Sequence, residues 1–178
     1  ASTPEDFPVT IPVLANDSDR DNDPLTVVNA VAGNGTVTIN PDGTISYQPD
    51  PDFNGFDIIT YTISDGNGGF STATVTIGVG IVNDAPVGTP IANQANIDSA
   101  PVSLATAGNF SDVDGDTLSF SATGLPPGLA IDPVTGIISG TLDGAASQPN
   151  GGVYSVTVTV ADGRGGQTTQ TFSWTVTN

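Results

Sequence analysis

Aspartate residues alternate with other residue types in two short stretches of the chain. The first stretch contains Asp17, Asp19, Asp21 and Asp23, and the second contains Asp112, Asp114 and Asp116. Alternate spacing predicts that the carboxylates of each stretch project from one side of an extended loop, about 5 to 7 Å apart. Two ionised carboxylates about 5 Å apart repel each other by roughly 3 kcal/mol at an effective dielectric constant near 20. Each stretch therefore needs a positive counter-charge to be stable.

Calcium is the counter-ion that these residues suit best. Carboxylate oxygens are hard ligands, and Ca²⁺ accepts about six to eight of them in flexible geometry, whereas Mg²⁺ keeps its waters. Neither stretch is an EF-hand loop, because the sixth residue from Asp19 is Pro24 and the sixth from Asp112 is Thr117, where that loop needs glycine. A solvated loop would explain any single aspartate, but two aligned runs favour calcium held by several loops together.

The composition excludes most catalytic and nucleic-acid-binding functions. The 178 residues include 19 acidic residues and two arginines but no lysine, histidine or cysteine, and the net charge is −17. The usual proton shuttle and thiol and amine nucleophiles are therefore missing, and no nucleophile and base pair is visible, so we predict that the protein is not an enzyme. The negative charge repels phosphates, and no run of about 18 apolar residues occurs, so we expect neither a nucleic-acid partner nor membrane insertion.

Apolar residues recur at every second position in several runs, including residues 59–63, 73–79, 154–160 and 172–176. A period of two indicates strands with one buried face. Clusters of glycine, proline and aspartate separate roughly seven such runs in each half, a pattern typical of β-sandwiches. We therefore predict an all-β protein made of tandem immunoglobulin-like Greek-key β-sandwiches. Disorder is the rival interpretation, but a hydrophobic content of 37% in orderly alternation favours a folded chain.

The chain contains an internal repeat. The second aspartate stretch follows the first at an offset of 93 residues (112 − 19), and residues 62–69 align with residues 159–166 at nearly the same spacing. The alternation of apolar and polar residues stops near residues 83–86, which end in a proline, and a new set of alternating runs begins after it. The repeat predicts a first domain of residues 1–84 and a second of residues 85–178.

The predicted topology brings separate loops to one end of each domain. In an immunoglobulin-like sandwich, the aspartate stretch and the turn at Asp65 share the end where the chain enters domain 1, and the turn at Asp162 does the same in domain 2. The calcium ligands predicted at the domain junction are Glu5, Asp50, Asp52, Asn83, Asp84, Asp112, Asp114, Asp116 and Asp162. Those predicted at the entry end of domain 1 are Asp17, Asp19, Asp21, Asp23 and Asp65. We expect the second set to meet a preceding neighbour in a longer chain.

Several of these motifs resemble those of cadherins. The segment Asn83-Asp84-Ala85-Pro86 resembles the cadherin linker, and Glu5 after Pro4 resembles the cadherin proline–glutamate pair. The D-x-D runs resemble the motif that cadherins bring to the interdomain cluster. The glutamate-bearing acidic motif of animal cadherins is missing, and residues 50–52 stand roughly where it would be, so the number of calcium ions at the junction stays open.

Further motifs extend the resemblance over nearly the whole chain. Domain 1, with residues 13–17, residues 43–47 and the Asp65 turn, is similar to the cadherin-like repeat found in tandem in large bacterial surface adhesins. Domain 2, with residues 110–116 and residues 125–129, is similar to the dystroglycan-type cadherin-like domain. The resemblance implies two cadherin-like β-sandwiches.

The resemblance also implies a function outside the cell. We expect a monomeric, calcium-stabilised extender segment of a secreted or surface-anchored bacterial adhesin, with neighbouring domains of the same chain as its partners. The alternative is a calcium-dependent module that binds polysaccharide. Its aromatic platform would come from Trp174, Tyr47, Tyr61 or Tyr154. A threonine array of Thr72, Thr74 and Thr76 could also form a flat ice- or sugar-binding face, but β-branched residues on the solvent side of a strand explain these threonines better. Alternation places most of the aromatic side chains inward, which favours core packing.

Overall fold

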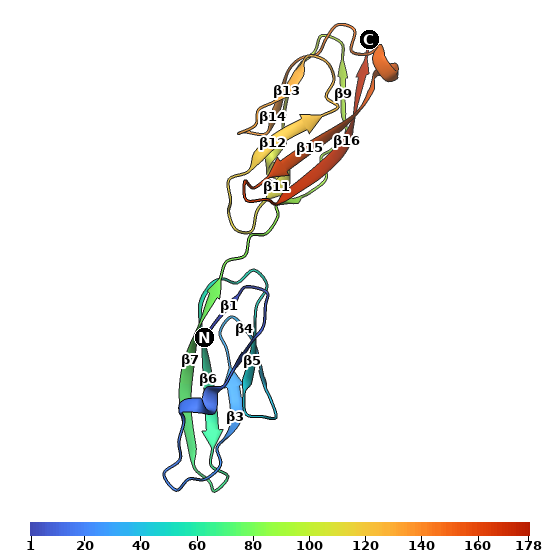
Figure 1. Ribbon diagram of the computed structural model, residues 1–178. Helices are drawn as coiled ribbons and strands as arrows, with labels where there is room; N and C mark the ends of the chain where they lie inside the picture. The colour runs from blue at the N-terminus through green and yellow to red at the C-terminus, as the bar shows by residue number, and fades with distance from the viewer. The chain divides into compact units, whose positions relative to one another are not determined.

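The computed structural model describes all 178 residues, and the chain divides into two compact units, unit 1 (Ala1–Val82) and unit 2 (Asn83–Asn178). Both units consist of strands with only short 3₁₀ turns, at Val13–Asn16, Ala107–Asn109 and Pro149–Gly152. The predicted fold class, tandem all-β domains, is confirmed (Figure 1). The structure contains no helix with the length and apolar character needed to cross a membrane.

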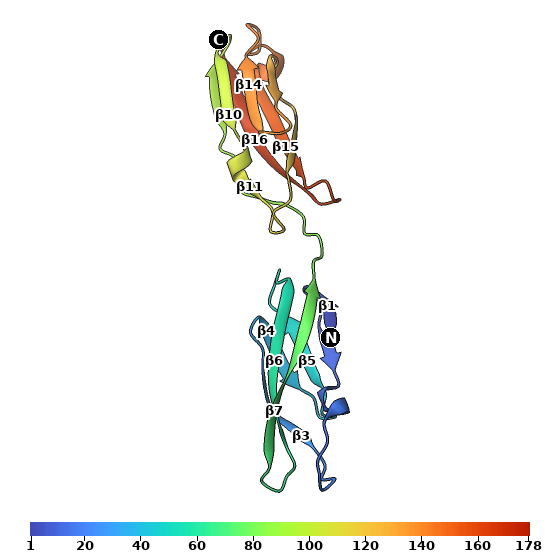
Figure 2. The ribbon, with the colours of Figure 1, turned by 90° about the vertical axis from the view of Figure 1, so that its left-hand side faces the viewer.

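Unit 1 is a sandwich of a four-stranded and a three-stranded sheet. Its strands are β1 (Ser2–Pro4), β2 (Val9–Ile11), β3 (Thr26–Val31), β4 (Gly35–Ile39), β5 (Ile45–Pro49), β6 (Gly55–Ser64) and β7 (Phe70–Gly80). The first sheet has the order β1-β7-β6-β3 and the second the order β2-β5-β4. The long β6–β7 hairpin runs the length of the unit (Figure 2), so its turn at residues 65–69 and the exit of the chain after Gly80 lie at opposite ends.

Alternate residues of the central strands fill the core of unit 1. Ile59 on β6 and Ile77 on β7 are fully buried, as are Ile45 and Tyr47 on β5. The intervening residues of β7, such as Thr74, face solvent. This period-two burial is the pattern that the sequence predicts for a strand with one face in the core.

Unit 2 is a second sandwich with one additional short ribbon. Its strands are β8 (Val87–Gly88), β9 (Gln94–Ile97), β10 (Pro101–Ala105), β11 (Phe110–Ser111), β12 (Ser119–Thr123), β13 (Leu129–Ile131), β14 (Ile137–Thr141), β15 (Val153–Ala161) and β16 (Gln167–Thr177). They form sheets of order β12-β15-β16-β9 and β10-β14-β13, and β8 pairs with β11. The β15–β16 hairpin ends in a turn at residues 162–166, and β16 also lies beside β8.

The aromatic residues considered as a sugar platform lie mostly in the cores. Trp174 is fully buried in unit 2, where its indole N–H donates to Asn96 Oδ1 at 3.0 Å. Tyr47 is fully buried and Tyr61 nearly so in unit 1. Tyr154 is partly buried, and its hydroxyl donates to the Ala146 carbonyl at 2.6 Å. Core packing is therefore the role of Trp174, Tyr47 and Tyr61, which leaves Tyr154 as the only partly exposed ring of the four.

Unit 1 contains a buried carboxylate, Asp57, that no pattern in the sequence predicts. Asp57 is only 3% exposed, and its oxygens accept hydrogen bonds from the backbone N–H groups of Gly33 (3.2 Å) and Asn34 (2.9 Å) and from the Tyr47 hydroxyl (2.9 Å). Burial raises the pKa of Asp57, but donors from Asn34, Tyr47, Ile58 and Gly33 together outweigh it and hold the pKa below its usual value. The ionised carboxylate thus anchors the β3–β4 connection.

Candidate metal centre

The second aspartate stretch lies in the loop between β11 and β12. It does not form the extended loop that the alternate spacing predicted, because Asp112 Oδ1 accepts the backbone N–H groups of Asp114 (3.0 Å) and Asp116 (3.3 Å). An aspartate side chain can capture backbone donors two to four residues on, and Gly115, with φ of 73°, permits the tight turn. The loop therefore curls around Asp112. One carboxylate oxygen from each of Asp112, Asp114 and Asp116 lies within 4.8 Å of the others.

The β15–β16 turn lies on one side of the site, and the β11–β12 aspartate loop lies on the other. Asp162 is 5% exposed, and its Oδ1 accepts the backbone N–H groups of Arg164 (2.7 Å), Gly165 (3.0 Å) and Gly166 (3.0 Å). Its pKa lies below the usual value, first because the Asn83 side chain donates to it and also because of these backbone donors. Because Oδ1 accepts three backbone hydrogen bonds from the turn, the main role of Asp162 is to stabilise this end of the hairpin.

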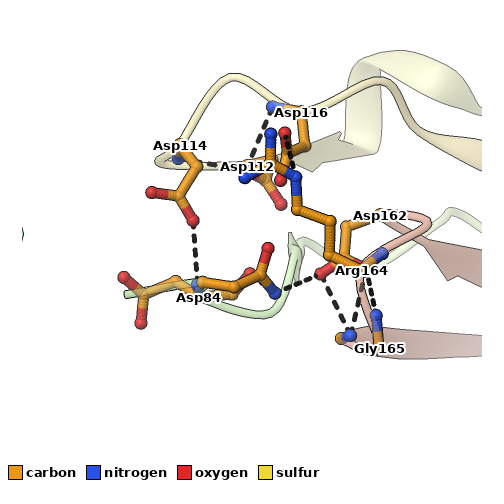
Figure 3. Close-up of polar contacts among 9 residues, drawn as sticks. Asp84, Asp112, Asp114, Asp116, Asp162, Arg164 and Gly165 are labelled. Atoms are coloured by element: carbon orange, nitrogen blue, oxygen red, sulfur yellow. Dashed lines mark hydrogen bonds and ion pairs between the residues drawn. The ribbon is translucent and has the colours of Figure 1, made fainter. Parts of the chain in front are cut away.

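The first residues of unit 2 are hydrogen-bonded to both the β15–β16 turn and the aspartate loop (Figure 3). The Asn83 side-chain Nδ2 donates to Asp162 Oδ2 at 2.8 Å, and the Asp84 backbone N–H donates to Asp114 Oδ2 at 2.8 Å. The sequence predicts that one place brings together Asn83, Asp84, the second aspartate stretch and Asp162. The structure brings them together at the entry end of unit 2.

Three oxygens of this cluster are buried without a hydrogen-bond partner: Asn83 Oδ1, Asp112 Oδ2 and Asp116 Oδ2. A buried acceptor that makes no hydrogen bond is costly, and a buried carboxylate oxygen more so. Hard oxygen donors from a carboxamide and carboxylates are the ligands that Ca²⁺ prefers. The residues present therefore fit a bound calcium ion, with the Asp114 carboxylate as a further donor.

One cationic side chain also reaches the cluster. Arg164 Nε lies 3.1 Å from Asp116 Oδ1, and the arginine side chain is 58% exposed while that of Asp116 is 11% exposed. Figure 3 shows the guanidinium extending from the β15–β16 turn towards the aspartate loop. This ion pair has no signal in the sequence, because Arg164 and Asp116 are far apart in the chain and no local pattern links them.

The first aspartate stretch has the same pattern of side-chain to backbone hydrogen bonds. It lies at the end of unit 1 that carries the β6–β7 turn. Asp19 Oδ1 accepts the backbone N–H groups of Asp21 (2.7 Å) and Asp23 (3.1 Å). Asp65 Oδ1 accepts those of Asn67 (2.8 Å) and Gly69 (2.9 Å). In place of an arginine, Asn67 Nδ2 donates to Asp23 Oδ2 at 2.8 Å. Both aspartate loops therefore adopt the same turn.

Asp17 belongs to the same end of unit 1 but has a different partner, since its Oδ2 accepts the Tyr61 hydroxyl at 3.0 Å. Burial, followed by this hydrogen bond and the charge of Asp17, raises the pKa of Tyr61. A pocket of about 190 Å³ opens beside this loop, between Asp19, Asp65 and Gly69. Calcium binding by the five carboxylates at this end stays a prediction.

Glu5, Asp50 and Asp52 lie at the other end of unit 1. Glu5 Oε1 accepts the backbone N–H of Val82 at 2.5 Å, and the Glu5 N–H donates to the Gly80 carbonyl at 2.8 Å. The Asp50 N–H donates to the Asn34 carbonyl at 3.1 Å, and the Asp52 N–H to Asp6 Oδ1 at 3.2 Å. The two Glu5 bonds hold the exit of the chain in place. Calcium binding by the three carboxylates stays a prediction.

Two glycines at equivalent positions of the two hairpin turns, Gly166 and Gly69, test how the Asn83–Ala85 segment packs against the β15–β16 turn. A Cβ on Gly166 would lie 2.2 Å from Asp162 Oδ2 and 2.7 Å from the Ala85 Cα, whereas one on Gly69 would meet only the Asp65 carboxylate, at 2.3 Å. We expect Gly166→Ala to displace the Asn83–Ala85 segment and to lower the unfolding free energy of unit 2 by about 1 to 3 kcal/mol. Gly69→Ala is the control, with a smaller loss in unit 1. Scanning calorimetry measures both, and equal losses would contradict the prediction.

Two family models match the chain. Residues 1–78 match the family described as "Bacterial Ig domain", and residues 85–177 match the family described as "Putative Ig domain". Among curated relatives, "Serine-rich adhesin for platelets" from Staphylococcus aureus strains MRSA252 and MSSA476 is 33% identical over 160 residues. The match covers 88% of this chain but only 11% and 6% of the length of those two adhesins.

Solved structures show the same fold. Human mucin-like protocadherin EC1-2 is similar with a TM-score of 0.57 and 16% identity, over 98% of this chain and 93% of that chain. Mouse cadherin-23 EC22-24 has a TM-score of 0.55 and 18% identity, over 85% of this chain and 53% of that chain. At these identities the likeness concerns the fold alone.

Proposed function

Because this chain belongs to the Ig-like domain families, with a bacterial Ig domain followed by a second Ig domain, we propose that it is a calcium-stabilised extender segment of a large bacterial adhesin. The relation to the staphylococcal adhesins supports a place at the cell surface or outside the cell. The role is structural rather than enzymatic. Its partners are neighbouring domains of the same long chain.

The observation that carries the calcium proposal is the set of buried, unpartnered oxygens at the entry end of unit 2. Asn83 Oδ1, Asp112 Oδ2 and Asp116 Oδ2 are three buried acceptors, and none of them receives a hydrogen bond. A divalent cation removes both the repulsion between the carboxylates and the cost of burying their oxygens without a partner. Extracellular calcium is plentiful enough to fill even the weak sites that are typical of extracellular modules.

The connection between the units is the part of the chain that calcium would stiffen. Val82, the last residue of unit 1, is bonded to Glu5 of the same unit. Asn83 and Asp84, the first residues of unit 2, are bonded to Asp162 and Asp114. Their acceptors on unit 2 are themselves members of the acidic cluster. Calcium that holds Asp112, Asp114 and Asp116 together would therefore fix Asn83 and Asp84 as well and leave the connection with little freedom to bend.

Small-angle X-ray scattering of the intact chain tests the extender role. With millimolar calcium, we expect one narrow distribution of interatomic distances, because the connecting residues are held. With a chelator, we expect the distribution to broaden as the carboxylates repel one another and release Asn83 and Asp84. Identical profiles, together with calorimetric proof that calcium binds, would refute the extender role while keeping the metal site.

A further inference from the structure

We propose that Arg164 is a built-in counter-cation of the unit 2 cluster, which stabilises Asp116 when calcium is absent and weakens calcium binding when it is present. The inference rests on the proposed calcium site. It concerns a residue that is no metal ligand itself, because a guanidinium has only donors. Arg164 thus acts through Asp116, as a positioning residue.

Arg164 is the only basic side chain in unit 2, since the other arginine of the chain is Arg20. The turn holds its backbone in place, because the Arg164 N–H donates to Asp162 Oδ1 at 2.7 Å. Its guanidinium then extends to Asp116 Oδ1 at 3.1 Å (Figure 3). A chain with 19 acidic residues and two arginines therefore places one of those arginines on the carboxylate cluster of unit 2.

Unit 1 contains the same contact without the charge. The residue equivalent to Arg164 in its turn is Asn67, whose Nδ2 donates to Asp23 Oδ2 at 2.8 Å. Asp23 is the last member of the first aspartate stretch, as Asp116 is of the second. Both turns thus donate a hydrogen bond to the carboxylate of the last aspartate of the neighbouring loop, and only in unit 2 is the donor itself a cation. The charge, rather than the contact, distinguishes the two units.

The arginine contacts one oxygen of Asp116 and leaves the other free for a metal ion. Nε lies beside Oδ1, while Oδ2 is buried and has no partner. A calcium ion on Oδ2 would therefore lie within a few ångströms of a positive charge. Because the arginine side chain is 58% exposed, it can move into solvent when calcium binds. Calcium must then either tolerate the guanidinium or displace it, and both lower the affinity.

Replacing Arg164 with the residue that unit 1 uses tests the inference. Arg164→Asn keeps a donor in the turn but removes the charge, and Arg20→Asn is the control that removes the same charge from unit 1. Trp174, the single tryptophan, lies in the core of unit 2, so the thermal change in its fluorescence reports the unfolding of this unit alone. The calcium dependence of that unfolding gives the affinity of the unit 2 site.

We expect opposite effects with and without the metal. In chelator, the Arg164→Asn variant should have a lower unfolding temperature of unit 2 than the natural protein. In calcium, the same variant should bind the ion about three- to tenfold more tightly, because a partly screened positive charge has been removed from near the site. Arg20→Asn should change neither quantity, and Arg164→Lys should stay close to the natural protein. Unchanged or weaker calcium binding by Arg164→Asn would overturn the inference. Absence of any calcium effect in the natural protein would instead overturn the metal site on which the inference rests.

Discussion

Asp116→Asn is expected to abolish most of the calcium-dependent rise in the unfolding temperature of unit 2. The substitution keeps the size of the side chain but replaces one of the buried, unpartnered carboxylate oxygens of the cluster with an amide group. A ligand present at a hundred times its dissociation constant stabilises the folded state by about 2.7 kcal/mol, which for a domain of this size corresponds to roughly 10 °C or more. Tryptophan fluorescence during heating, with calcium and with chelator, measures the difference.

The equivalent substitution in unit 1 is the control for this experiment. Asp23 has the same place in the first aspartate stretch and accepts a hydrogen bond from Asn67. Asp23→Asn should leave the calcium response of the Trp174 signal intact, because Trp174 lies in the core of unit 2. If Asp116→Asn retains the full calcium shift, Asp116 is not a ligand and the proposed site is wrong.

Asp57→Ala is expected to lower the unfolding free energy of unit 1 by about 3 kcal/mol. The substitution removes the carboxylate that accepts from the N–H groups of Gly33 and Asn34 and leaves the Tyr47 hydroxyl with only the Asn34 carbonyl. Hydrogen bonds to a charged group contribute about 1.5 to 3 kcal/mol each. Scanning calorimetry should show the unit 1 transition at a lower temperature. The transition followed by tryptophan fluorescence should not move.

Asp57→Asn refines this test, because the amide keeps one acceptor and loses the charge. The pKa of Asp57 is lowered in the folded protein from the usual 3.8, so the ionised form contributes stability above that value. This contribution disappears as the pH falls from 3.8 through the lowered pKa. The natural protein should therefore be more stable than Asp57→Asn at neutral pH, and the difference should shrink below about pH 4. A difference that does not change with pH would show that the charge of Asp57 is not what stabilises unit 1.

The fold class followed from patterns that are local in the chain. Alternation in segments such as residues 172–176 identified strands, and the turn residues between them marked hairpins, because burial of one face of a strand imposes a period of two on the residues themselves. The resemblance to cadherin-like bacterial Ig repeats is confirmed by the family models and the structural neighbours. The core position of Trp174 followed from the same alternation.

The sequence also identified the residue types of the candidate site, but their geometry depended on contacts between distant segments. Alternate aspartates suggested an extended loop, whereas Asp112 draws the backbone of Asp114 and Asp116 into a turn. The ion pair of Arg164 with Asp116 and the role of Asp57 left no trace in local spacing. Such contacts form only when hairpins far apart in the chain are packed against each other. Amino-acid composition and periodicity therefore determined what kind of domain forms and which residue types gather in its loops. Tertiary packing decided which carboxylates accept backbone hydrogen bonds, which form an ion pair and which oxygens are left without a hydrogen-bond partner.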